Sequence, residues 1–223
     1  MKKMLLMTIL VTLVVCYSAW AGPCPTSDTL ADYVALGSTG CNIGDLDFTN
    51  FAYTPTGVNA PIGSEVTVKT ITGTESGFAF DAGWAADSGN EQDSLIQYTV
   101  TCDGCSITDL ILKMHGNFAA GNSFINIAET EDSSLVPGLG LEDVGGGTTI
   151  ASASEAFSPE GTLQLSKDIH IDGGNNGNSA GVSSVINLFS TNQTTTTPEP
   201  SVLILCSGFV FLLPVVRRKL RRV

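Results

Sequence analysis

The stretch that decides the fold reads LIQYTVTCDGCSITDLILKM and spans Leu95–Met114. On both sides of its Cys-Asp-Gly-Cys segment every second side chain is apolar, a period of two that is typical of half-buried β-strands. The alternating apolar residues are Ile96, Tyr98 and Val100 before the cysteines and Leu110, Leu112 and Met114 after them.

The segment between these two strands predicts a β-hairpin with a disulfide at its tip, from Cys102 to Cys105. A three-residue loop with Gly104 in a bulge would set Tyr98 opposite Thr108, which keeps the apolar residues on one face. Redox-active or reduced thiols are the alternatives. A thioredoxin-like site would need a helix after the first cysteine, and a zinc site would need a second pair of ligands.

Strand-like alternation continues outward from this stretch, in segments separated by Gly, Asn, Asp and Ser. About eight strands in about 170 residues predict an all-β fold, a two-sheet sandwich of the kind that includes jelly rolls, over residues 22–190. The segment Val136–Ala156, with three consecutive glycines, is predicted to be a long loop. The predicted strands are Leu46–Tyr53, Glu65–Ile71, Gly77–Phe80, Leu95–Thr101, Ile107–His115, Phe124–Thr130, Leu163–Ile171 and Val182–Phe189. In the seventh strand Lys167 interrupts a face of otherwise apolar residues.

The chain has six cysteines, of which Cys16 and Cys206 lie in the apolar segments near its two ends. The body keeps four, and an even number in an exported domain predicts two disulfides. Four cysteines allow three connectivities, of which pairing between sequence neighbours is favoured: Cys24 with Cys41 and Cys102 with Cys105.

A short helix is predicted between Cys24 and Cys41. Its apolar residues Leu30, Tyr33 and Val34 have helical spacing, Ser27 is the expected N-cap and Gly37 the expected C-terminal stop.

The charges are distributed unevenly along the 223 residues. The chain has 10 Lys+Arg and 22 Asp+Glu, a formal charge of −12, but most basic residues lie at the two ends. Between Lys3 and Arg217 only three lysines stand against all 22 acids, which gives this part a formal charge of −19. Nucleic-acid binding needs clustered Lys and Arg, so that function and docking to anionic lipid are excluded.

The N-terminus has the three parts of a secretory signal peptide. Lys2-Lys3 is basic, residues 4–15 are mostly apolar, and Ala19-Trp20-Ala21 is a small-x-small cleavage site. We therefore predict a signal peptide over residues 1–21, recognised by the secretion machinery and signal peptidase, and a mature chain that begins near Gly22. A retained anchor is the alternative.

The C-terminus combines a Thr-rich linker (residues 191–197), Pro198-Glu199-Pro200, an apolar segment (residues 201–216) and a basic tail. Sixteen helical residues rise about 24 Å, a little less than the ~30 Å hydrocarbon core of a bilayer. We predict a single transmembrane helix with the body outside and the tail inside. The tail comprises Arg217, Arg218, Lys219, Arg221 and Arg222.

This order of segments resembles the PEP-CTERM sorting tag, which is found on exported proteins of Gram-negative bacteria, many of them producers of exopolysaccharide. The resemblance covers about the last 26 residues, 198–223. It implies that an exosortase, a membrane protease or transpeptidase, recognises Pro198, Glu199 and Pro200 and releases the body to the cell surface or extracellular matrix. A permanent single-pass anchor is the alternative.

The sequence contains no motif for a common class of enzyme: there is no G-x-S-x-G, phosphate-binding loop or H-E-x-x-H. His115 and His170 are predicted to lie on strand surfaces, so no catalytic residue is assigned. No cofactor or metal ligand is assigned either. Two oxygen-rich turns, Asp87–Asp93 and Asp172–Gly177, make structural Ca²⁺ an alternative, although neither has the EF-hand pattern.

Three functions therefore remain. The first is an exported surface or matrix protein without catalytic activity. The second is a carbohydrate-binding module for exopolysaccharide, which would present exposed aromatics. The third is a secreted hydrolase, which would need a cleft with convergent carboxylates, one of them with a raised pKa. The aromatic candidates for the second function are Phe78, Phe80, Trp84, Phe118 and Phe157.

Overall fold

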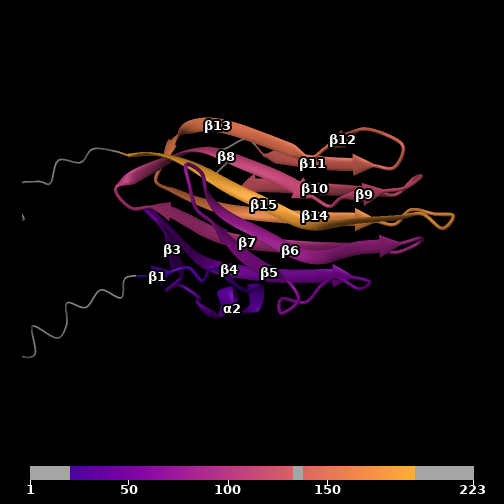
Figure 1. Cartoon of the computed structure of the whole chain (residues 1–223), viewed down its shortest axis with the longest axis horizontal. Helices are drawn as coiled ribbons and strands as arrows, with labels where there is room; N and C mark the ends of the chain where they lie inside the picture. The colour runs from indigo at the N-terminus through magenta and orange to yellow at the C-terminus, as the bar shows by residue number, and fades with distance from the viewer. Residues whose placement is uncertain (1–20, 133–137, 194–223) are drawn as a thin grey trace, which may run out of the picture. The chain divides into compact units, whose positions relative to one another are not determined.

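The computed structural model of the protein describes residues 21–132 and 138–193 (Figure 1). The predicted signal peptide up to Trp20, including Ala19, lies outside these residues. So do most of the Thr-rich linker and the whole sorting tag, with its PEP motif, apolar segment and basic tail. Among the described residues, no helix is long and apolar enough to cross a membrane.

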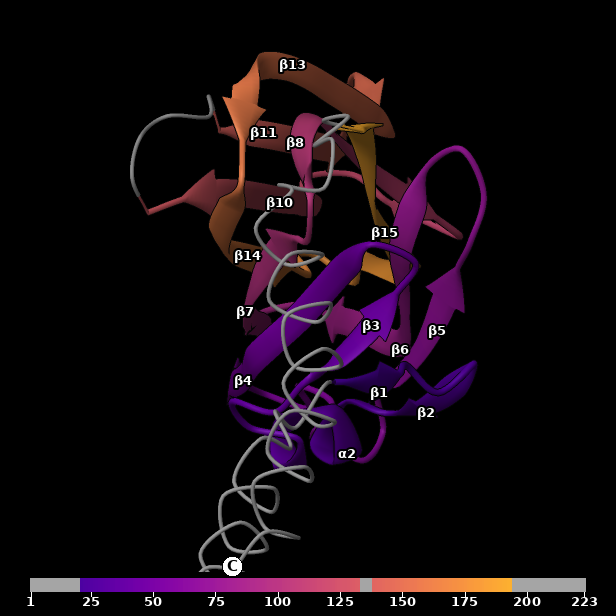
Figure 2. The same cartoon turned by 90° about the vertical axis from the view of Figure 1, so that its left-hand side faces the viewer.

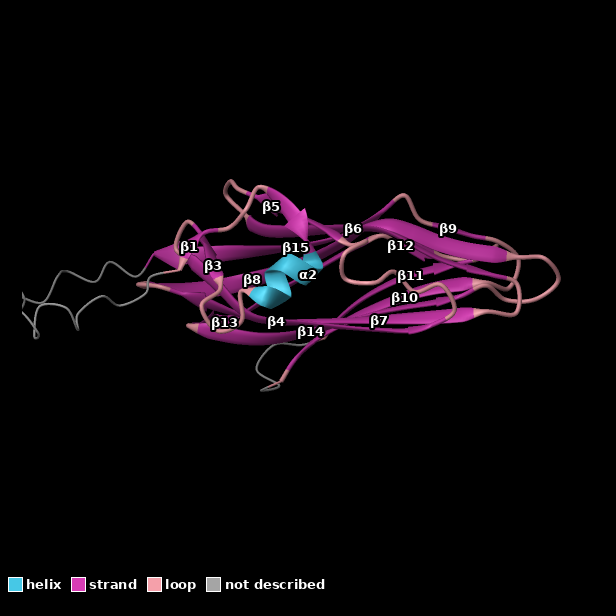
Figure 3. Ribbon diagram, turned by 90° about the horizontal axis from the view of Figure 1, so that it is seen from below, coloured by secondary structure: helices cyan, strands magenta, loops and turns pink. Residues whose placement is uncertain are grey.

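Two β-sheets pack face to face, so the predicted all-β sandwich is confirmed (Figures 1 and 3). Within the described residues, one sheet has eight strands in the order β1-β3-β4-β7-β14-β10-β11-β12. These strands are β1 (Gly22–Pro23), β3 (Cys41–Ile43), β4 (Leu46–Gly57), β7 (Glu91–Cys102), β14 (Thr162–Asp172), β10 (Phe124–Glu131), β11 (Leu139–Val144) and β12 (Thr149–Ile150).

The second sheet has seven strands, in the order β13-β8-β15-β6-β5-β2 with β9 paired to β15. These strands are β13 (Ser152–Glu160), β8 (Cys105–His115), β15 (Ser179–Gln193), β6 (Ser76–Asp87), β5 (Thr67–Ile71), β2 (Ser27–Thr29) and β9 (Phe118–Ala119). All eight predicted strands are therefore present, several of them longer than predicted.

The core lies between the sheets and is built by strand alternation. In β14 the residues Leu163, Leu165, Ile169 and Ile171 are buried together with Lys167, whereas the residues that alternate with them are half-buried or exposed. Phenylalanine and tyrosine rings from both sheets meet in edge-to-face contacts, for example Phe48 and Phe78 with centroids 4.6 Å apart.

The hairpin predicted around Cys102 and Cys105 is wrong. β7 and β8 alternate as predicted, but β7 belongs to the eight-stranded sheet and β8 to the seven-stranded sheet. The connection at Asp103-Gly104 crosses the sandwich instead of joining paired neighbours. A hairpin within one sheet and a crossing between two sheets bury the same alternate residues, because in both cases each strand turns its apolar face to the core.

The long loop predicted for Val136–Ala156 is also wrong, because much of this segment forms β11, β12 and the start of β13. Leu139 and Leu141 are buried at alternate positions of β11. β13 is an edge strand without large buried side chains, and it contains Pro159, which edge strands tolerate.

The predicted short helix is present as α2 (Leu30–Ala35), which lies along β4 (Figure 3). Its N-cap is Thr29, whose hydroxyl accepts a hydrogen bond from the Asp32 amide at 3.2 Å. The prediction of Ser27 as the cap is wrong, because Ser27 begins β2. Leu30 and Tyr33 are buried, but Val34 is exposed.

The sandwich has two distinct ends. The disulfide end carries Cys102 and Cys105; the glycine-loop end carries the turns at residues 88–90, 120–123 and 173–178 (Figure 1). β7 runs from one end to the other, and twelve strand residues span about 36 Å. The first described residues and the last residues of β15 are at the disulfide end, which faces the viewer in Figure 2.

Candidate functional site

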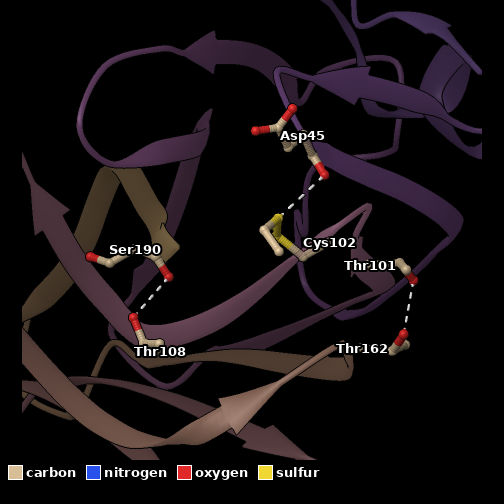
Figure 4. Close-up of a disulfide and its surroundings, with 7 residues drawn as sticks. Asp45, Thr101, Cys102, Thr108, Thr162 and Ser190 are labelled. Carbon is tan, nitrogen blue, oxygen red and sulfur yellow. Dashed lines mark hydrogen bonds between the residues drawn. A yellow bond between two sulfur atoms is a disulfide. The ribbon is translucent and has the colours of Figure 1, made fainter. Parts of the chain in front are cut away.

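Both disulfides join the cysteine pairs that are neighbours in sequence. Cys24 bonds to Cys41 with their Cα atoms 4.7 Å apart, and Cys102 bonds to Cys105 with their Cα atoms 5.2 Å apart. Figure 4 shows the second disulfide beneath the Asp45 turn, with the Asp45 carbonyl 3.9 Å from Cys105 Sγ. The four cysteines are therefore used as structural crosslinks of the disulfide end.

An acidic cleft of about 570 Å³ lies at the disulfide end. The turn between β3 and β4 supplies Asp45, β4 supplies Asp47, and the crossing between the sheets supplies Asp103. The Asp103 amide donates a hydrogen bond to the Asp45 carbonyl at 2.9 Å, which fixes the two turns together. Burial raises the pKa of Asp47, and the negative charge of Asp103 raises it further. The other lining residues are Ala21, Ser38, Thr39, Asn42, Gly44 and Thr49.

A second cleft, of about 320 Å³, lies at the glycine-loop end, and we call it the glycine-loop cleft. It brings together the two oxygen-rich turns noted in the sequence. The first turn leads into β7, and the second follows β14. Its lining residues are Gly89, Asn90, Glu91, Asn122, Asp172, Gly174 and Asn175.

Backbone hydrogen bonds dock these two turns on each other. The Gly89 amide donates to the Gly174 carbonyl at 2.7 Å, and the Gly173 amide donates to the Asn90 carbonyl at 3.0 Å. A Cβ on Gly173 would lie 2.1 Å from the Asp87 carbonyl oxygen, so only glycine allows this approach.

Side chains complete the walls of the glycine-loop cleft. Asn122 Oδ1 accepts hydrogen bonds from the Asn175 amide at 2.9 Å and from Asn178 Nδ2 at 2.7 Å. Asp172 Oδ1 accepts from the Gly174 amide at 2.7 Å. Among the described residues, no group of three or more His, Cys, Asp or Glu side chains is placed to hold a metal ion.

The outer face of the eight-stranded sheet adjoins this cleft. His170 Nδ1 lies 2.9 Å from Asp93 Oδ1, and the His170 ring lies 5.3 Å from the Phe124 ring. Burial raises the pKa of Asp168, with a further increase from Asp93 and an opposing effect of His170. His170 thus lies on the outer strand face, as predicted, and His115 is exposed at the end of β8.

The aromatic candidates differ sharply in exposure. Trp84 is 1% exposed, and Phe78 and Phe80 are equally buried, so all three are core residues. Phe157 is partly buried. Phe118 is 51% exposed and lies in β9, four residues before Asn122 of the glycine-loop cleft.

Sequence reasoning did not find the acidic cleft, because its carboxylates come from segments far apart in the chain. It also missed a buried polar cluster of Tyr98, Glu129, Lys167 and Asn187 in the core. The only signal of this cluster was the lysine on an otherwise apolar face of β14.

No family model matches the sequence, and no curated protein matches it. A solved structure of TmCBM61 in complex with β-1,4-galactotriose is similar at 8% identity and TM-score 0.30, over 60% of this chain and 86% of that one. The enzymatically active domain of bacteriophage CBA120 tailspike protein 4 is similar at 14% identity and TM-score 0.28, over 63% of this chain and 19% of that one.

A third structure comes from work on carbohydrate-binding modules of the β-sandwich superfamily. It is 11% identical with a TM-score of 0.18, over 78% of this chain and 61% of that one.

Proposed function

We propose that the chain is an exported protein of the cell surface or extracellular matrix, sorted by an exosortase and without catalytic activity of its own. We further propose that its β-sandwich binds exopolysaccharide at the glycine-loop cleft. The observation that carries the binding proposal is the convergence of two amide- and carboxylate-rich turns, held by backbone hydrogen bonds, in one cleft.

The two disulfides support export, because such bonds persist in oxidising compartments. The route of export rests on the terminal sequences. The N-terminal signal directs secretion, and the tag at residues 198–223 holds the chain in the inner membrane until the exosortase cuts it.

Replacing Pro198-Glu199-Pro200 by three alanines tests the sorting route. The wild-type chain is expected in the medium or matrix with a mass that lacks residues 1–21 and the apolar tail. The variant is expected to remain uncut in the membrane fraction. Replacing Thr194-Thr195-Thr196 by alanines is the matched control, which should be processed normally. Release of both variants with the wild-type mass would contradict exosortase sorting.

The chemistry of the glycine-loop cleft supports a sugar ligand. Its Asn, Asp and Glu side chains offer amide donors and oxygen acceptors in fixed positions, which suits the many hydroxyl groups of a glycan. Phe118, in β9 just before the turn at residues 120–123, offers an exposed ring for stacking.

The negative charge of the body limits which polysaccharides it can bind. A formal charge of −19 between the basic ends repels polyanions, so neutral chains are the favoured ligands. A glycan array with and without Ca²⁺ tests this: binding to neutral glycans under both conditions supports the proposal. If binding appears only with Ca²⁺ and only on acidic glycans, the cation bridges protein and glycan, and the proposal of a neutral ligand is wrong. Absence of binding under both conditions would refute the proposal that the cleft binds glycans.

The acidic cleft favours one second candidate, a carboxylate-dependent hydrolase. Asp47 and Asp103 both line the cleft, and the raised pKa of Asp47 is what a general acid requires. Release of reducing ends from exopolysaccharide, abolished by Asp47→Asn and by Asp103→Asn, would establish it. Wild-type protein that releases none would exclude it.

A further inference from the structure

A lysine, a glutamate and an asparagine meet in the core of the sandwich. Lys167 Nζ lies 2.9 Å from Glu129 Oε2 and 2.8 Å from Asn187 Oδ1. Lys167 and Glu129 are directly opposite each other on β14 and β10, whereas Asn187 lies on β15 in the other sheet. The lysine side chain therefore reaches from one sheet to the other.

The surroundings of this cluster are buried and include aromatic rings. The side chains of Lys167 and Glu129 are 0% exposed, and Asn187 is equally buried. The Tyr98 hydroxyl also donates a hydrogen bond to Asn187 Oδ1, and the Phe80 ring centroid lies 6.0 Å from Lys167 Nζ. The second carboxyl oxygen of Glu129, Oε1, has no hydrogen-bond partner.

An ion pair is a poor state for these groups, because burying two charges costs more than their attraction returns unless every polar atom is satisfied. Burial raises the pKa of Glu129, against the opposing effects of Lys167 and Asn187. Burial also lowers the pKa of Lys167, against the effect of Glu129. Both shifts favour transfer of the proton from Lys167 to Glu129, and the neutral amine that this transfer leaves is a nucleophile.

We propose that Lys167 and Asn187 become joined by a side-chain amide bond, formed within the folded domain with Glu129 as the proton carrier. The bond would link the two sheets through the core. It is independent of the proposed ligand and of the sorting route.

The reaction balances without any other reactant. The neutral Nζ of Lys167 attacks Cγ of Asn187, and the developing negative charge on Oδ1 is stabilised by the Tyr98 hydroxyl. Glu129, as the neutral acid, delivers its proton to Nδ2, and the resulting carboxylate accepts a proton from Nζ. The bond between Cγ and Nδ2 then breaks, ammonia leaves, and Cγ and Nζ remain joined as an amide. The folded core supplies the close approach that makes this attack effectively unimolecular.

Digestion by a protease that cleaves before aspartate tests the proposal directly on the full-length chain, after folding in cells and then denaturation and reduction. Cleavage before Asp143, Asp168 and Asp172 separates Lys167 from Asn187. We expect the fragment 143–167 to remain covalently attached to the fragment that begins at Asp172, with a mass one ammonia molecule below their sum. Two separate fragments of full mass would overturn the proposal.

The fragment readout is needed because Asn176-Gly177 could also lose ammonia by cyclisation, which would mimic the change in whole-protein mass. That reaction would leave the two fragments separate, so it counts against the crosslink.

Two variants test the assigned roles. Glu129→Gln keeps the shape but cannot carry the proton, so its two fragments should separate with Lys167 and Asn187 both intact. Lys69→Met is the control, because it removes a lysine from a surface ion pair with Asp81 and should leave the crosslink unchanged. A crosslink of undiminished yield in Glu129→Gln would overturn the role of Glu129.

Discussion

The ionisation of Tyr33 is coupled to the fold. Its ring packs edge-on against Phe51 and Phe78, and its hydroxyl donates a hydrogen bond to the Pro25 carbonyl at 2.9 Å. Burial raises the pKa of Tyr33 to about 12, and the nearby charge of Asp28 adds to the increase. The neutral phenol is therefore the form that the folded state accepts.

The alkaline stability of the domain should reflect this pKa. A tyrosine of the unfolded chain ionises near pH 10, so the contribution of Tyr33 is complete below pH 10 and is lost as the pH rises towards about 12. The free energy of unfolding, from denaturant titrations across this range, should fall more steeply for wild type than for Tyr33→Phe. Equal slopes would contradict the raised pKa. Tyr53 and Tyr98 ionise in both proteins, so the difference isolates Tyr33.

Gly173 should be intolerant of any side chain. An added Cβ would meet the backbone at Asp87, so Gly173→Ala is expected to cost about 1–3 kcal/mol in the free energy of unfolding. Gly140→Ala is the matched control: a Cβ there meets nothing within 4 Å, and the change should stay within about 0.5 kcal/mol. Denaturant titrations measure both, and equal costs would contradict the docking of the two turns.

Lys167 shows what a single strand can and cannot reveal. Its place on an apolar face was evident from the alternation of β14. Its partners were not, because Glu129 is set by strand register and Asn187 by the packing of the other sheet. Neither relation can be read from the local alternation of apolar and polar residues.

The two disulfides brace different elements at the same end of the sandwich. Cys24–Cys41 encloses α2 with a sequence separation of 17, and Cys102–Cys105 closes the crossing between β7 and β8 with a separation of 3. In the chain-entropy account a longer closed loop gives the larger stabilisation, about 3 kcal/mol for the first and about 2 kcal/mol for the second.

Removing each pair by alanine substitution should separate these contributions. The Cys24→Ala/Cys41→Ala protein should lose more stability than the Cys102→Ala/Cys105→Ala protein, measured as the free energy of unfolding by denaturant. The reverse order would contradict the chain-entropy account and show that the Cys102–Cys105 bond also stabilises the folded β7–β8 crossing.

The strands themselves were predictable and their pairing was not. Alternation located all eight predicted strands, because each has one buried and one outer face. The partners of β7 and β8 depend on which sheet each joins, and both choices bury the same residues. β13 escaped prediction for another reason: an edge strand of small and polar residues has no apolar period to detect.

At the scale of the whole molecule, the described body has a different cleft at each of its two ends. The first described residues and the last residues of β15 lie at the disulfide end, where the acidic cleft is, and the glycine-loop cleft lies at the opposite end (Figure 1). A chain held through its C-terminus would thus leave the glycine-loop end accessible. The sequence predicted both oxygen-rich turns but could not show that they meet, because β7 and β14 are distant in sequence and adjacent only in the sheet.

Calorimetric titration of the released protein with a neutral exopolysaccharide, in parallel with Phe118→Ala and Asp103→Asn, tests the central claim most directly. Phe118 lies at the glycine-loop end and Asp103 in the acidic cleft. We predict that wild type and Asp103→Asn bind alike and that Phe118→Ala binds about tenfold more weakly, because a lost stacking contact is worth about 1.4 kcal/mol. Unchanged binding by Phe118→Ala together with lost binding by Asp103→Asn would contradict the account and place the ligand at the disulfide end.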